Sequence, residues 1–117
     1  HDLLTGLGNR AHFHERVAEA LAGAAADAGA RTVAILLVDL DGFKLVNDTA
    51  GHAAGDALLR EVADRLRQAT RGSDLVARLG GDEFAVLLGG VEGEADAVRV
   101  AERIIAALGR PVRVGGT

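Results

Sequence analysis

A run of seven residues from Thr32 to Val38 is apolar apart from its first side chain, and it ends at Asp39. A short run rich in Val, Ile and Leu is typical of a β-strand. A strand that is apolar at every position is typical of the centre of a sheet, buried on both faces. Such a strand needs other strands beside it and helices packed over it. The run therefore predicts a layered domain with Asp39 at the carboxyl end of its central strand.

Helical patterns surround this strand. Apolar residues at helical spacing predict helices over 10–26, 53–69 and 94–108, and a short helix or turn over 43–49. Gly109 is placed to cap the last helix, and Pro111 prevents its continuation. The side chains expected to face inward are Phe13, Val17, Ala20, Leu21 and Ala24, then Leu58, Leu59, Val62 and Leu66, then Ala97, Ala101, Ile104, Ile105 and Leu108.

Two apolar segments, 75–79 and 84–88, flank the residues Gly80-Gly81-Asp82-Glu83. This arrangement predicts a β-hairpin within 74–88, with two glycines and two carboxylates at its tip. Glycine adopts positive φ and lets a ligand approach the backbone closely. Adjacent acids repel each other unless a cation or a reacting group uses them. The segment is thus suited to a metal and phosphate site, but taken alone it favours a plain turn with solvated acids.

The order of these elements predicts the fold class. A first helix precedes a strand-helix-strand-strand-helix series, and a weak extended segment follows at 112–114. This is the order of a ferredoxin-like palm, an α/β (α+β) fold with a mainly antiparallel central sheet flanked by helices. A chain of 117 residues is large enough for one core, so we expect a single domain over 1–117.

The composition excludes several classes of function. A net charge of −4, with three phenylalanines as the only aromatic side chains besides histidine, argues against a nucleic-acid binder. The absence of cysteine excludes disulfides, thiolate metal sites and thiol catalysis. No apolar run approaches the ~20 residues that cross a bilayer, and no signal peptide is visible. These features predict a cytoplasmic domain.

Two acidic residues, Asp39 and Asp41, follow the expected central strand. Open sheets place ligands at the carboxyl ends of strands, and a hairpin paired beside this strand brings Asp82 and Glu83 toward Asp39. Three carboxylates at one point suit Mg²⁺ or Mn²⁺, ions that activate a hydroxyl and stabilise a leaving pyrophosphate. The alternative is a helix cap or a turn. We favour the metal role for Asp39 and the turn role for Asp41.

A second polar cluster, residues 47–56, precedes the long helix and contains Asn47, His52 and Asp56. Amide and carboxylate side chains present the donors and acceptors that match a purine edge. The adjacent N–H donors of guanine suit a carboxylate such as Asp56. Taken alone, the cluster is more typical of turn formation and helix capping than of nucleotide binding.

These motifs occur together in one order: Asp2-Leu-Leu-Thr-Gly-Leu-Gly-Asn-Arg10, Asp39-Leu-Asp-Gly-Phe-Lys44, Asn47-Asp48, Gly51-His52, Gly55-Asp56 and Gly80-Gly-Asp-Glu-Phe84. The series resembles the GGDEF family, the diguanylate cyclases that make cyclic di-GMP from two GTP. The resemblance runs from the first residues to about Leu108 and implies a palm of the nucleotidyl-cyclase type.

The resemblance implies a role for each matching residue. Asp39 and Asp82 would bind the metal ions, Mg²⁺ or Mn²⁺, together with the backbone carbonyl of Leu40. Asp82 or Glu83 would assist deprotonation of the attacking 3′-hydroxyl, with Asp82 favoured. The other implied contacts are Lys44 with the triphosphate, Asn47 and Asp56 with the guanine, His52 beside it, and the Gly80 and Gly81 backbone near the phosphates. One hairpin holds one GTP, so catalysis would need a homodimer.

Arg71-Gly-Ser-Asp74 matches the Arg-x-x-Asp inhibitory motif of this family at the family's spacing from Gly80. Arginine pairs with phosphate or with a guanine edge, and aspartate reads guanine N–H groups, so product bound here would inhibit the enzyme. Arg99 or Arg103 would complete the site. The alternative is an ordinary turn with a surface ion pair.

Members of the family usually continue through a strand with a Ser-x-Gly element and a last helix whose Lys and Arg touch phosphates. We therefore expect a fragment of a longer signalling protein with sensory or effector domains, either free in the cytoplasm or anchored to a membrane. Two alternatives to the cyclase are a cyclic di-GMP receptor using Arg71 and Asp74, and a GTP-binding regulatory domain of an attached enzyme. The presence of Asp39, Asp82 and Glu83 favours the cyclase.

Overall fold

The order of elements agrees with the sequence pattern. The computed structural model describes residues 1–26, 32–72, 74–91 and 93–109. The sequence left open whether residues 43–49 form a short helix or a turn, and the structure shows a helix over 43–50. The expected tail at 112–114 lies outside the described residues. The elements are α1 (Arg10–Ala26), β1 (Thr32–Asp39), α2 (Phe43–Ala50), α3 (His52–Ala69), β2 (Leu75–Gly80), β3 (Glu83–Val91) and α4 (Glu94–Leu108).

The three described strands form one antiparallel sheet in the order β1-β3-β2. The expectation that the run from Thr32 to Val38 is the central strand is wrong for this sheet, because β3 lies between the other two. Within the described residues β1 pairs on one side only. Its alternate side chains Ile35 and Leu37 are 43% and 74% exposed, so β1 is not buried on both faces.

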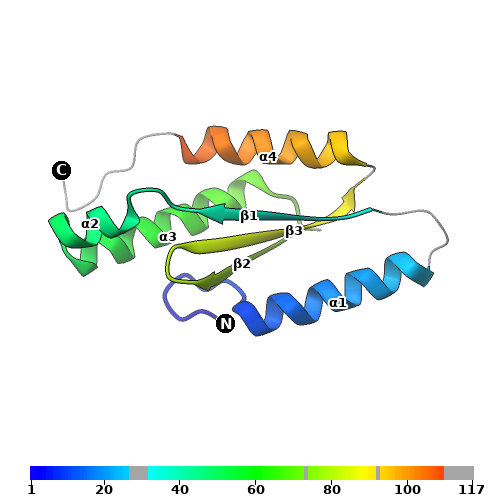
Figure 1. Cartoon of the computed structure of the whole chain (residues 1–117), viewed down its shortest axis with the longest axis horizontal. Coiled ribbons are helices and arrows are strands. Elements are labelled where there is room, and N and C mark those ends of the chain that lie inside the picture. The colour runs from blue at the N-terminus through cyan, green and yellow to red at the C-terminus, as the bar shows by residue number, and fades with distance from the viewer. Residues whose placement is uncertain (27–31, 73, 92, 110–117) are drawn as a thin grey trace.

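Helices cover the two faces of the sheet unequally (Figure 1). Helices α3 and α4 pack on one face, where Leu59, Leu66 and Ile104 meet Phe84 and other side chains of β3. Helix α1 lies on the opposite face, where the smaller cluster forms around Phe13. Since successive side chains of a strand point to opposite faces, β3 supplies both clusters. The sheet is therefore the middle of three layers.

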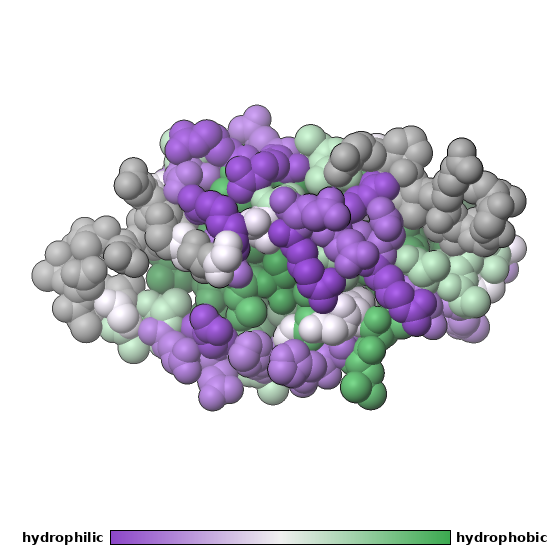
Figure 2. Space-filling model, turned by 180° about the vertical axis from the view of Figure 1, so that it is seen from behind, coloured by the Kyte–Doolittle hydropathy of each residue, from purple (hydrophilic) through white to green (hydrophobic). Residues whose placement is uncertain are grey.

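Two inward positions predicted from helical spacing are wrong. Leu21 of α1 is 55% exposed and Ile105 of α4 is 70% exposed. Residues advance by about 100° around a helix, so Ile105 lies to the side of Ile104. Val100, which is one turn before Ile104, takes the core position instead and is 2% exposed. Apolar surface with hydrophilic margins is visible on the face shown in Figure 2.

The helices of the described residues differ from membrane-spanning helices in length or hydropathy. None of them combines the length and the hydropathy that a membrane span requires. The longest, α3, is amphipathic rather than uniformly apolar, with its buried side chains facing the sheet and α4.

Candidate active site

The end of β1 lies directly beside the hairpin turn, as expected from the sequence. Asp39 and Glu83 are register partners in the β1–β3 ladder. The N–H of Leu40 donates to the carbonyl oxygen of Asp82 at 3.3 Å. Paired residues of antiparallel strands project to the same face of the sheet, so the Asp39 and Glu83 side chains lie on one side. The structure thus brings together Asp39, Leu40 and the two acids of the turn.

The carboxylates at this end of the sheet lack the arginine partners that several other acids of the described residues have. Asp2, Asp74 and Asp96 each pair with an arginine. By contrast, Asp39, Asp82 and Glu83 find no hydrogen-bonding or ion-pairing partner for their carboxylates among the described residues. These carboxylates are therefore available to a cationic ligand.

The available donors are hard oxygen atoms. The expectation that the side chains of Asp39, Asp82 and Glu83 meet at one point is wrong for this structure, because the described residues contain no group of three or more His, Asp and Glu side chains arranged around one metal position. The set implied by the motifs is smaller, two carboxylates with the carbonyl oxygen of Leu40. Mg²⁺ commonly takes one or two protein carboxylates and completes its octahedron with water and substrate phosphates. This donor set fits Mg²⁺ or Mn²⁺ bound together with a nucleotide triphosphate.

The turn itself is built from two glycines in conformations that other residues rarely adopt. The φ angles are 150° at Gly80 and 50° at Gly81. A Cβ placed on either glycine would meet no atom within 4 Å. Their backbone conformation, not crowding, requires glycine here. The open space above the turn leaves its backbone accessible to a ligand.

Helices α2 and α3 bring the polar cluster of residues 47–56 into one place. Gly51 joins the two helices with a φ of 92°. A Cβ on Gly55 would overlap the amide oxygen of Asn47, so this side chain sits directly against Gly55, the residue before Asp56. Asp56 is half-buried, whereas His52 and Lys44 are exposed in the first turns of their helices. The junction of α2 and α3 therefore brings Asn47 to the first turn of α3, the helix that carries Asp56.

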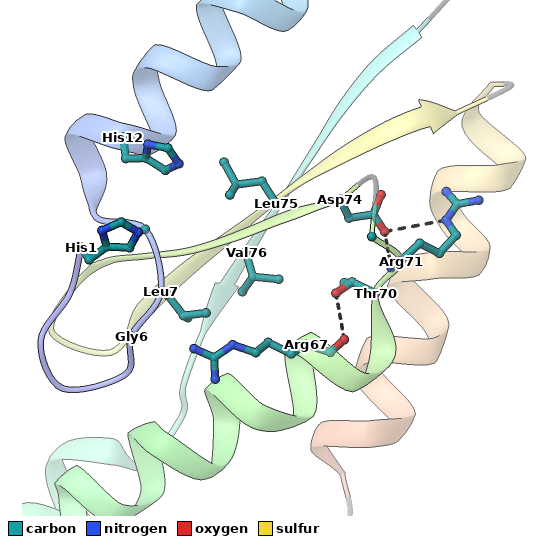
Figure 3. A pocket seen from close by; sticks show the side chains of 12 residues that line it. His1, Gly6, Leu7, His12, Arg67, Thr70, Arg71, Asp74, Leu75 and Val76 are labelled. Carbon is teal, nitrogen blue, oxygen red and sulfur yellow. Dashed lines mark hydrogen bonds and ion pairs between the residues drawn. The ribbon is translucent and has the colours of Figure 1, made fainter.

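The Arg71–Asp74 motif lies where β2 begins, away from the hairpin turn (Figure 1). The Asp74 side chain is fully buried and its carboxylate accepts hydrogen bonds from the N–H of Arg71 at 2.9 Å and of Gly89 at 3.1 Å. The Arg71 side chain is 45% exposed, with Nε 3.8 Å from Asp74 Oδ2. Figure 3 shows both residues at one end of a pocket of about 380 Å³.

The comparisons with known proteins identify the family. The family model described as diguanylate cyclase, GGDEF domain, matches residues 1–117. The chain belongs to the GGDEF domain family. This GGDEF chain is 51% identical over 114 residues to the diguanylate cyclase TpbB of Pseudomonas aeruginosa. That alignment covers 97% of the chain and 26% of TpbB, so the chain spans about a quarter of its relative.

Solved GGDEF domains share the fold. A structure of the TpbB GGDEF domain from Pseudomonas aeruginosa has a TM-score of 0.93 and 50% identity, covering 100% of this chain and 67% of that one. The GGDEF domain of DgcB from Caulobacter crescentus, solved in complex with c-di-GMP, has a TM-score of 0.78 and 36% identity. That match covers 88% of this chain and 58% of the DgcB chain. The expected family and α+β fold are confirmed.

The geometry of this GGDEF domain distinguishes the two arginines that could complete the Arg71 site. Arg99 pairs with Asp96 at 3.1 Å, and Asp96 also lies 4.0 Å from Arg71. Arg103 instead donates to the carbonyl oxygen of Ala69 at 2.7 Å, at the end of α3. Arg99 is therefore the arginine linked to Arg71.

Sequence reasoning missed Arg65 near the candidate active site of this GGDEF domain. Arg65 is only 8% exposed and pairs with Glu61 at 3.0 Å. It lines a pocket of about 240 Å³ together with Asp39 and Asp41. The available signal was its position on the apolar face of α3, between Val62 and Leu66, where a charged residue is unusual.

Proposed function

We propose that this GGDEF domain is the catalytic domain of a diguanylate cyclase, which condenses two GTP into cyclic di-GMP. The observation that carries the proposal is the register of β1 with β3. It places Asp39 opposite Glu83 and beside Asp82, with no basic partner among the described residues. This arrangement occurs in a chain half identical to a diguanylate cyclase.

The reaction is a phosphoryl transfer. The 3′-oxygen of one GTP forms a bond to the α-phosphorus of the other, and the bond from that phosphorus to the leaving pyrophosphate breaks. The carboxylate of Asp82 takes the proton of the 3′-hydroxyl, and Glu83 is the alternative base. A second step of the same kind closes the ring and releases the second pyrophosphate. Such reactions depend mainly on positioning and charge stabilisation.

The remaining residues bind and orient GTP in this proposal. Asp39, Asp82 and the Leu40 carbonyl would hold Mg²⁺ or Mn²⁺, which supplies positive charge to the triphosphate when bound. The Lys44 ammonium adds a mobile positive charge from the exposed first turn of α2. The Asn47 amide donates to and accepts from the guanine edge, and the Asp56 carboxylate accepts from the guanine N–H groups. The open backbone at Gly80 and Gly81 allows phosphate oxygens to approach.

Catalysis in this proposal needs two copies of the chain. Each chain carries one hairpin turn and one Asn47–Asp56 pair, which is enough for one GTP. A bond between two nucleotides therefore forms only when two domains face each other with their turns opposed. Such a twofold arrangement also explains how one kind of site can form both bonds of a symmetric product.

The same proposal includes product inhibition through Arg71. In it, Asp74 holds the turn in place and does not read guanine. The two N–H groups that Asp74 accepts fix the turn at the start of β2, and its side chain is closed to solvent. Arg71, which is partly exposed, is the residue available to meet a phosphate or a guanine edge. Arg99 adds a second guanidinium through the shared contact with Asp96.

The test is product formation from GTP with Mg²⁺, followed by chromatography. We expect the unaltered chain to form cyclic di-GMP. Asp82→Asn should lower kcat by at least about 100-fold, because it removes the base and a charge without changing the side chain's shape. Glu83→Gln should lower it less. Glu102→Gln, which removes an exposed acid of α4, should leave the rate unchanged.

The contrary outcome is a folded chain that binds GTP, as shown by a rise in Tm with added nucleotide, yet forms no product. That result would refute catalysis by this chain and favour the GTP-binding regulatory domain. A chain that binds cyclic di-GMP but not GTP would favour the receptor.

A further inference from the structure

The N-terminal lead-in, defined as residues 2–9, has no part in the proposed reaction, yet it is tightly organised. Asp2 Oδ2 accepts hydrogen bonds from the N–H and the hydroxyl of Thr5, at 2.9 and 2.6 Å. Thr5 is 7% exposed and Leu7 is 5% exposed. The carboxylate of Asp2 is therefore held by its own loop, which in turn is seated on the core.

Arg78 connects this carboxylate to the hairpin turn. Its Nη1 lies 3.2 Å from Asp2 Oδ1, while Nε and Nη2 donate to the carbonyl oxygen of Gly81 at 3.1 and 2.8 Å. The side chains of Arg78 and Asp2 are 15% and 21% exposed. A planar guanidinium serves two acceptors on different sides in a fixed geometry, whereas the donors of a lysine ammonium rotate freely on a flexible stem.

The lead-in is also fixed to β2 and α3, so it can act as a support. The N–H of Arg78 donates to the carbonyl oxygen of Gly8 at 3.0 Å. Arg67 Nη2 donates to the carbonyl oxygen of Thr5 at 2.6 Å. Burial raises the pKa of the Asp2 carboxyl, but hydrogen bonds from Thr5 and the charge of Arg78 outweigh burial and hold that pKa below its ordinary value.

The carbonyl that Arg78 holds belongs to the peptide unit joining Gly81 to Asp82. Two glycines with positive φ leave this turn many alternative conformations. The β2–β3 register also shifts between Arg78 and Gly80, so the ladder does not fix the turn by itself. A contact that fixes the Gly81 carbonyl therefore fixes the direction from which the Asp82 side chain leaves the backbone.

We propose that Asp2 and Arg78 are positioning residues, which hold the Gly81 carbonyl and thereby orient Asp82 and Glu83 toward Asp39. The proposal rests on the proposed function for the catalytic role of these acids. Its structural part, that the lead-in sets the conformation of the turn, stands on the contacts alone.

Nuclear magnetic resonance of the unaltered chain, Asp2→Asn and Arg78→Lys separates the two parts. We expect both variants to shift the amide resonances of Gly80, Gly81 and Asp82. They should also speed hydrogen exchange at Leu40, whose N–H donates to Asp82. Arg16→Lys, which alters an exposed ion pair of α1, should leave these resonances in place. The double variant should shift them no further than Arg78→Lys, because both changes act through one network.

Turnover measured on the same proteins tests the functional part. We expect kcat to fall by about 10- to 100-fold in Asp2→Asn and Arg78→Lys, with KM for GTP nearly unchanged, since misplacement by about 1 Å has effects of this size. Unmoved Gly80 and Gly81 resonances in both folded variants would overturn the proposal, and so would moved resonances with normal kcat. If the unaltered chain lacks turnover while the resonances move, the proposed function fails and the positioning of the turn holds.

Discussion

At the scale of single residues, Asp74 shows how a motif residue can act through the backbone. Its carboxylate is fully buried and accepts from two backbone N–H groups on separate segments, at Arg71 and Gly89. Asp74→Ala leaves these donors without their acceptor, so we expect the free energy of unfolding to fall by about 1–3 kcal/mol. Urea denaturation measures this change, and no ligand is needed.

Arg71→Ala is the matched variant with which the stability of Asp74→Ala is compared. The Arg71 side chain is 45% exposed and its contact with Asp74 is long, at 3.8 Å, so its removal should alter stability by less than about 1 kcal/mol. It should nevertheless abolish inhibition by cyclic di-GMP. Equal stability of Asp74→Ala and the unaltered chain would show that the buried contacts of Asp74 do not hold the turn.

At the scale of elements, the junction of α2 and α3 depends on the absence of a side chain at Gly55. Gly55→Ala would push the Asn47 amide away, because a Cβ there overlaps its oxygen. Asn47 can rotate into solvent and alanine favours the helix, so we expect stability to change by less than about 1 kcal/mol. The affinity for GTP should fall by about tenfold, the value of one lost hydrogen bond.

Isothermal titration calorimetry measures the GTP affinity of Gly55→Ala, and Asn47→Ala is the variant for comparison. Because both changes remove the same contact, Gly55→Ala made in the Asn47→Ala background should have no further effect on affinity. An additive loss in the double variant would mean that Gly55 acts through something other than Asn47.

At the scale of the whole molecule, the two candidate sites occupy different ends of β2, whose six residues span about 20 Å. The turn with Asp82 lies at one end and the Arg71–Asp74 motif at the other (Figure 1). Product bound at Arg71 therefore leaves the hairpin turn of the same chain uncovered. Under the proposed function, inhibition through Arg71 would therefore act by changing how two chains face each other, not by blocking GTP directly.

Mixing experiments test the requirement for two chains. With an excess of Asp82→Asn, most dimers that contain an unaltered chain are mixed and retain one competent base. We expect such mixtures to release a linear dinucleotide, since one bond forms and the ring does not close. Activity of the unaltered chain per molecule should also rise with protein concentration. Constant activity per molecule down to concentrations at which the chain is monomeric would contradict a dimeric site.

Much of this architecture follows from the sequence alone. Short-range periodicity determined where the helices and strands lie, because burial of one face of a helix or strand imposes a period that local sequence records. The motif residues gave the family and its implied site. The contact of Asp39 with the hairpin could be expected because a strand end and a hairpin tip must meet when the two pair.

Only the tertiary structure decided matters that depend on residues distant in sequence. The central place of β3, the exposure of Leu37 and Ile105, and the burial of Asp74 depend on which surfaces meet, and no local period encodes this. The link from Asp2 through Arg78 joins residues 76 positions apart. Local sequence specifies what each segment can bury, whereas the packing of the whole chain selects the polar partners, since a buried charge must find one wherever the fold provides it.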